Sequence, residues 1–126
     1  MTAITGIHHV SLLVADTERA LAFYCGVLGL SLAPRPPLAF PGAWLALGGQ
    51  QIHLLELPNP DPVEGRPPHG GRDRHLALAC SGLDGIRRRL DAEEVAYTLS
   101  KSGRKALFCR DYDGNAIELL ETEARI

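Results

Sequence analysis

The chain has 126 residues, of which 45% are hydrophobic and 22% are charged, and its formal net charge is -2. These values predict an ordinary globular domain and exclude any general attraction to nucleic acid or to an anionic membrane. No run of residues approaches the roughly 18 apolar positions of a membrane span, and the start of the chain lacks the pattern of a secretory signal, so we expect a cytoplasmic protein.

Three cysteines, Cys25, Cys80 and Cys109, are spread along the sequence without a CxxC spacing. An odd number without that spacing argues against a disulfide framework and against a zinc site built from thiolates. We therefore expect three small thiols that are buried or half-buried.

The first half of the chain predicts a strand, a helix and then three strands. Alternation over 7–14 places His9, Ser11 and Leu13 on one face of a strand, and a helix then runs from Asp16 or Thr17 to Gly29. Further strands are expected near 30–34, 43–48 and 51–57, the last two joined by a glycine turn. This β-α-β-β-β module covers about residues 5–57.

The second half predicts the same order after an irregular linker over 58–73, which is rich in proline and glycine. We expect one helix at 83–92 and a last hairpin turn at Asp113-Gly114. The strands are expected at 74–80, 95–99, 104–110 and 115–121. The second module thus covers about 74–122, and two modules of this size are expected to share one core as a single α+β domain with mixed, mostly antiparallel strands.

A sequence repeat relates the two modules. The run from Ile7 to Leu12 is echoed from Arg74 to Leu78, which places His9 over His75 at an offset of about 66 residues. The run from Gln51 to Glu56 is echoed from Ala116 to Glu121, which places His53 over Glu118 at an offset of about 65 residues. Two matches at nearly one offset indicate a duplicated module.

The residues that the repeat aligns are the nitrogen and oxygen donors that a divalent cation requires. One such residue on a strand is usually structural, but an ionised Glu118 in its apolar run would be costly to bury without a cation. We therefore predict a shared metal site of His9, His53, His75 and Glu118, with His8 excluded because it faces the other way. These ligands do not select among Zn, Ni, Mn, Co and Fe.

Other side chains are predicted to contact the substrate, although each also has a structural alternative. Basic residues in the linker and in a later loop could bind a carboxylate or a phosphate, or could simply be solvated. Two aromatic residues on equivalent strands could wall an apolar pocket, or pack in the core. These residues are Arg66, His69, Arg72, Lys101, Arg104, Trp44 and Phe108.

Two stretches resemble the vicinal oxygen chelate superfamily, which contains glyoxalases, bleomycin resistance proteins and dioxygenases. The run from Ile7 to Leu30 resembles its opening strand and helix, and the run from Arg110 to Leu119 resembles its closing hairpin. The resemblance spans nearly the whole chain. It implies paired βαβββ modules forming a half-open barrel around a divalent metal, usually in a homodimer, with His9, His75 and Glu118 as the metal triad.

The chain departs from the superfamily pattern at three positions. His53 stands where glyoxalase I enzymes usually carry a carboxylate, and the more positive site would favour an anionic oxygen ligand such as an enediolate, a phosphonate or a catecholate. Phe108 stands where fosfomycin thiol transferases tend to have an aromatic hydroxyl, which makes that activity less favoured. Tyr112 replaces a turn proline.

These features predict a metal-dependent, glyoxalase-like lyase or isomerase acting on a small substrate that chelates through adjacent oxygens. Glu118 is the expected general base, and His53 is either a fourth ligand or a proton shuttle. Resemblance to glyoxalase I implies a glutathione hemithioacetal, held by the basic loops. The alternatives are an Fe(II)-dependent ring-cleaving dioxygenase, a fosfomycin-type thiol transferase, and a drug- or metabolite-binding module without enzymatic activity, against which the intact ligand set argues.

Overall fold

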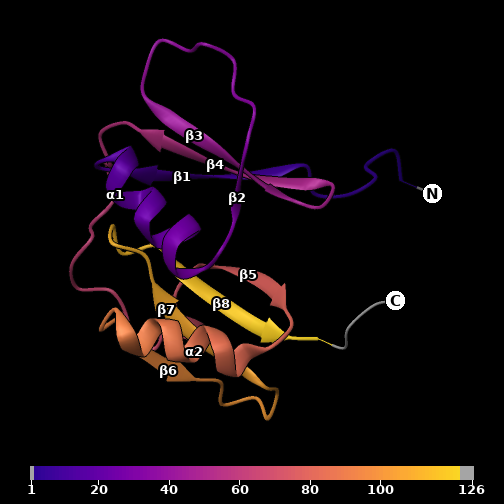
Figure 1. Ribbon diagram of the computed structural model, residues 1–126, viewed down its shortest axis with the longest axis vertical. Coiled ribbons are helices and arrows are strands. Elements are labelled where there is room, and N and C mark those ends of the chain that lie inside the picture. The colour runs from indigo at the N-terminus through magenta and orange to yellow at the C-terminus, as the bar shows by residue number, and fades with distance from the viewer. Residues whose placement is uncertain (1, 123–126) are drawn as a thin grey trace. The chain divides into compact units, whose positions relative to one another are not determined.

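The computed structural model describes residues 2–122, and the chain divides into two compact units, Met1–Pro60 and Asp61–Ile126. Each unit contains one four-stranded sheet, drawn from indigo to magenta in the first unit and from orange to yellow in most of the second (Figure 1). Within both units the chain order is strand, helix, strand, strand, strand. The predicted fold class and the predicted order of elements are therefore confirmed.

The first unit forms a mixed sheet in the order β1-β4-β3-β2. Strand β1 runs parallel to β4, whereas the β3–β4 and β2–β3 pairs are antiparallel. Gly48, with a φ of 57°, opens the tight turn between β3 and β4, a conformation that glycine adopts without strain. The strands are β1 (His9–Val14), β2 (Ser31–Ala33), β3 (Gly42–Leu47) and β4 (Gln50–Glu56).

The first helical segment is less regular than the sequence predicts. The α-helix α1 (Thr17–Leu21) is capped by the Asp16 carboxylate, which accepts a hydrogen bond from the Arg19 amide at 3.2 Å. It continues as a π-helical segment, η1 (Ala22–Val27), and Gly29 then adopts a φ of 78°, as expected for a helix C-terminus. The apolar residues of the stripe continue through both segments, so their spacing in the sequence could not reveal the change from α-helix to π-helix.

The second unit repeats the topology of the first, with sheet order β5-β8-β7-β6 and one parallel pair, β5 with β8. Its helix α2 (Leu83–Ala92) has the predicted bounds, and a short 3-10 turn, η2 (Gly70–Arg72), interrupts the linker. The strands are β5 (His75–Cys80), β6 (Tyr97–Leu99), β7 (Ala106–Arg110) and β8 (Ala116–Glu121). Among the described residues, no helix combines the length and apolar character needed to cross a bilayer.

In each unit, buried apolar side chains on one face of the sheet pack against the helix. In the first unit, Leu45, Ile52 and Leu54 are at most 1% exposed, and α1 contacts β4. In the second, Leu107, Ile117 and Leu119 are at most 2% exposed, and α2 contacts β8. Because strand side chains alternate, His53 and Glu118 point to the opposite face of their own sheets.

Two glutamates cap the helices of their own units, a role that the sequence repeat did not reveal. Glu56 at the end of β4 accepts hydrogen bonds from the Thr17 amide (2.8 Å) and hydroxyl (3.1 Å). Glu121 at the end of β8 accepts from the Leu83 amide at 2.9 Å and pairs with Lys105 at 3.2 Å. The hydrogen bond from the Leu83 amide has the largest effect and that from Lys105 the next, and together they hold the pKa of Glu121 below its ordinary value. Each carboxylate therefore joins the last strand of its unit to the start of its helix.

The three cysteines are free thiols, as expected. Cys25 and Cys80 are half-buried and Cys109 is buried. Burial, together with the nearby Asp111 carboxylate, raises the pKa of Cys109 to about 12, so this thiol stays protonated at neutral pH.

We expect Gly42→Ala to lower the free energy of unfolding by about 2 to 3 kcal/mol. A β-carbon at Gly42 would collide with the backbone carbonyl oxygen of Leu54 and would lie 3.2 Å from the Arg35 guanidinium. Gly26→Ala is the matched control, because outside its chain neighbours and the nearby backbone of its own helix no heavy atom lies within 4 Å of the added carbon. Urea denaturation measures both variants, and equal stabilities would contradict a close approach of β3 to β4 at Gly42.

Candidate metal-binding site

The first unit brings His9 and His53 into direct contact, and we call this pair the first half-site. His53 lies in the middle of β4, opposite Ser11 of β1 and Trp44 of β3. Its ring is sandwiched between two others, with ring centroids 4.0 Å from His9 and 4.0 Å from Trp44. Only 8% of His53 is exposed. The strand register therefore fixes the imidazole of His53 beside that of His9.

Two further residues complete the hydrogen bonding of the first half-site. The Nε2 atom of His53 lies 2.8 Å from Gln51 Oε1, and His9 Nδ1 lies 2.9 Å from His8 Nδ1. His8 precedes β1, so strand alternation does not govern its direction, and its ring joins that of His9 despite the prediction that it faces away. Burial, together with the charges of His9 and His8, lowers the pKa of His53. His53 is thereby kept in the neutral form that a metal ligand requires.

The second unit brings His75 and Glu118 into contact, and we call this pair the second half-site. Glu118 lies in the middle of β8, opposite Ala77 of β5 and Phe108 of β7. Its Oε1 atom is 3.2 Å from His75 Nε2, and Glu118 is 3% exposed. His53 and Glu118 thus occupy equivalent positions in their sheets, each opposite an aromatic residue.

The hydrogen bonding of His75 determines which of its ring nitrogens faces Glu118. The Nδ1 atom of His75 lies 3.0 Å from the backbone carbonyl oxygen of Asp73. A carbonyl only accepts, so Nδ1 carries a proton and the Nε2 of a neutral ring has a lone pair facing the Glu118 carboxylate. A stable contact then needs either a second proton or a metal cation at that position. A carbonyl that orients the far nitrogen is the usual support for a metal-binding histidine.

Asp73 is fixed in turn by two arginines. Its carboxylate pairs with Arg66 at 3.2 Å and with Arg110 at 2.9 Å, and accepts from the Arg74 amide at 2.8 Å. Burial alone would raise the pKa of Asp73, but the hydrogen bonds from Arg110 and Arg74 and the charge of Arg66 outweigh it and lower the pKa. Arg66, predicted to contact the substrate, is therefore engaged in holding the segment that orients His75.

The remaining predicted basic residues lie in different surroundings. His69 Nδ1 is 2.7 Å from the Thr98 hydroxyl, and its ring packs edge to face with Phe108 at 4.9 Å. Arg104 reaches the second half-site, with its Nη2 atom 3.3 Å from Glu118 Oε2. Arg72 and Lys101 are exposed.

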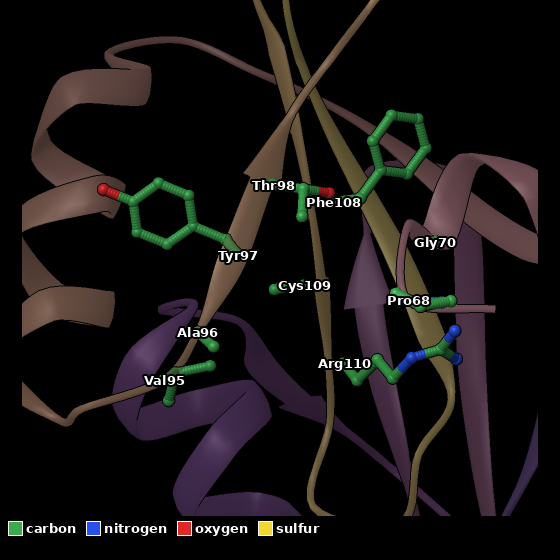
Figure 2. Close-up of a pocket in the computed structure, with 9 residues that line it drawn as sticks. All are labelled: Pro68, Gly70, Val95, Ala96, Tyr97, Thr98, Phe108, Cys109 and Arg110. Atoms are coloured by element: carbon green, nitrogen blue, oxygen red, sulfur yellow. The ribbon is translucent and has the colours of Figure 1, made fainter. Parts of the chain in front are cut away.

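A half-open cavity of about 230 Å³ lies beside Phe108 in the second unit. The Phe108 ring contacts the His75 ring edge to face at 5.1 Å, so the cavity adjoins the second half-site. Figure 2 shows Phe108 and Thr98 close together, whereas Tyr97 points toward α2, where Arg87 donates to its hydroxyl. The lining residues are Pro68, Gly70, Val95, Ala96, Tyr97, Thr98, Phe108, Cys109 and Arg110.

Neither unit gathers three potential metal ligands by itself within residues 2–122. Each contributes two donors, imidazole with imidazole in the first unit and imidazole with carboxylate in the second.

Comparison with known proteins agrees with this architecture. The chain is 30% identical to Glyoxylase I 4 of Arabidopsis thaliana, over 96% of this chain and 73% of that protein. It is also 30% identical to MhqA of Bacillus subtilis, which is proposed to be a ring-cleaving dioxygenase, over 95% of this chain and 41% of that protein. A crystal structure from Bacillus anthracis, assigned to the glyoxalase family, superposes with a TM-score of 0.80 at 24% identity, covering 98% of this chain and 99% of the other.

The family model of the glyoxalase, bleomycin resistance protein and dioxygenase group matches residues 6–119, which include both half-sites. The predicted resemblance is thereby confirmed. This chain belongs to the Glyoxalase/Bleomycin resistance protein/Dioxygenase superfamily.

Proposed function

We propose that the protein is a divalent-metal-dependent lyase or isomerase of the glyoxalase type, acting on a small substrate with adjacent oxygen atoms. The contact between His75 Nε2 and Glu118 Oε1 carries this proposal, because it requires a cation or a proton at the position where a metal would lie. His9 and His53 supply the other two ligands. We also propose that the protein is a homodimer.

A bound divalent cation would stabilise negative charge on adjacent substrate oxygens. Glu118 is the general base in this proposal, because its carboxylate is held away from water and has two oxygens, one of which can take a proton from the substrate carbon. His53 is kept neutral and can either complete the ligand set or move a proton. Trp44 stacks on His53 and the Phe108 ring contacts His75, so each aromatic ring would exclude water from its own half-site.

We propose a glutathione hemithioacetal of a 2-oxoaldehyde as the substrate. The similarity to Glyoxylase I 4 supports this choice. The exposed basic residues Arg72, Lys101 and Arg104 would bind the carboxylates of the tripeptide, because guanidinium and ammonium groups recognise such anions.

The test is metal loading followed by an activity assay. Purified protein is stripped with a chelator, reloaded with Zn, Ni, Mn, Co or Fe, and analysed for bound metal per chain. We expect stoichiometric binding of at least one ion, and formation of a lactoyl thioester from methylglyoxal and glutathione. If no ion binds stoichiometrically, the metal-dependent function is wrong; if metal binds but no thioester forms with any ion, only the substrate is wrong.

A ring-cleaving dioxygenase is the second candidate function. Two histidines and one carboxylate form the ligand set of non-haem Fe(II) oxygenases, and the similarity to MhqA favours the same chemistry. Oxygen uptake by the Fe(II)-loaded protein with a catechol would support this candidate over the first. A protein that binds no metal, and whose ligand affinity is unchanged by His75→Ala, would instead be a binding module.

A further inference from the structure

The buried carboxylate of Glu118 has two partners within its own unit. Its Oε1 atom lies 3.2 Å from His75 Nε2, and its Oε2 atom lies 3.3 Å from the Arg104 guanidinium. The Glu118 side chain is 4% exposed, whereas that of Arg104 is 57% exposed. A buried carboxylate needs a counter-charge, and here the charge comes from a residue that is free to return to water.

The loop between β6 and β7 is built to present Arg104 to Glu118. Ser102 Oγ accepts from the Arg104 side-chain Nε at 3.1 Å, and a second hydroxyl, that of Ser100, lies 2.8 Å from Ser102 Oγ. Gly103 has a φ of 85°, which places the bend immediately before Arg104. The guanidinium is therefore positioned by its own loop and does not depend on Glu118 for its orientation.

Other arginines of this unit are not suited to the same role. Arg110 donates to Asp73 and to the backbone carbonyls of Gly114 and Pro67, and Arg66 donates to Asp73 and to the carbonyl of Pro62. Movement of either would remove one of the charged partners of Asp73. Arg104, by contrast, can leave Glu118 without breaking a structural network.

We propose that Arg104 is a replaceable counter-cation of Glu118 and the anion receptor of the site. Arg104 neutralises Glu118 when no metal is bound, a metal displaces it, and the released guanidinium then binds a carboxylate or phosphonate group of the ligand. A dication bound at Oε1 repels a guanidinium held at Oε2 of the same carboxylate, and this repulsion weakens the hold of Glu118 on Arg104. This inference rests on the proposed function and makes anion recognition conditional on metal occupancy.

The test compares Arg104→Gln with Arg104→Lys and with Arg88→Gln, which removes the same charge from the exposed face of α2. Chelator-treated proteins are titrated with Co²⁺ at pH 8, and the metal-loaded proteins are then titrated with methylphosphonate. We expect Arg104→Gln to bind Co²⁺ about threefold to fivefold more tightly than the wild type, because an exposed competing ion pair has been removed. Methylphosphonate binding should weaken by about tenfold in this variant. Arg104→Lys should keep most of the methylphosphonate affinity, and Arg88→Gln should match the wild type in both titrations.

The outcomes separate this inference from the proposed function. If Arg104→Gln binds Co²⁺ no more tightly than Arg88→Gln, or if it binds methylphosphonate as well as the wild type, the role of Arg104 is wrong while the metal site stands. If neither the wild type nor Arg104→Gln binds Co²⁺, the metal site and the role of Arg104 are both wrong.

Discussion

Glu118→Gln is expected to weaken divalent metal binding by more than about 100-fold. The substitution keeps the shape of the side chain but removes the only carboxylate among the four proposed ligands. At a metal concentration about 100 times the Kd, binding should stabilise the wild type by about 2.7 kcal/mol, and this stabilisation should disappear in the variant. Thermal unfolding with and without metal measures the difference.

The matched control is Glu93→Gln, which makes the same chemical change at an exposed residue after α2. It should retain the metal-induced increase in Tm. His75→Ala should behave like Glu118→Gln, because both remove one donor from the second half-site. If Glu118→Gln still gains the wild-type increase in Tm, Glu118 is not a metal ligand and the proposed site is wrong.

The sequence predicted the order of strands in both sheets and the equivalence of His53 with Glu118, because strand alternation and a duplicated pattern are local properties of the chain. His53 and Glu118 occupy equivalent register positions, as their alignment in the repeat implies. Their aromatic neighbours Trp44 and Phe108 are equivalent for the same reason.

The parts that the sequence did not reveal depend on contacts between distant segments. The repeat aligned Glu56 with Glu121 but gave no role to either, although each lies three residues after a proposed ligand and therefore on the opposite face of its strand. The position of these glutamates on the helix-facing side of the strand was the one indication in the sequence that they cap a helix. The basic composition of the linker suggested that Arg66 contacts the substrate, but composition cannot show that Arg66 forms an ion pair with Asp73.

Asp73→Asn is expected to lower the free energy of unfolding by about 2 kcal/mol at pH 7. The substitution leaves Arg66 and Arg110 without their shared counter-charge, and their side chains are 20% and 25% exposed. We place the loss below that of a fully buried pair because water still reaches both guanidinium groups. Asp61→Asn is the control: its ion pair with Arg74 is more exposed, so the loss there should stay below about 1 kcal/mol.

The pH dependence of this loss identifies its electrostatic origin. The pKa of Asp73 is lower in the folded chain than in the unfolded chain, so its ionisation contributes stability above the ordinary aspartate pKa of about 3.9. That contribution is lost as the pH falls through the lower pKa of the folded state, whereas asparagine does not titrate. Urea denaturation should therefore show the full difference between wild type and Asp73→Asn at pH 7 and a smaller one near pH 2. A difference that stays constant over this pH range would mean that Asp73 stabilises the fold through packing rather than through its charge. The ion pair between Asp73 and Arg66 would then not be needed to orient His75.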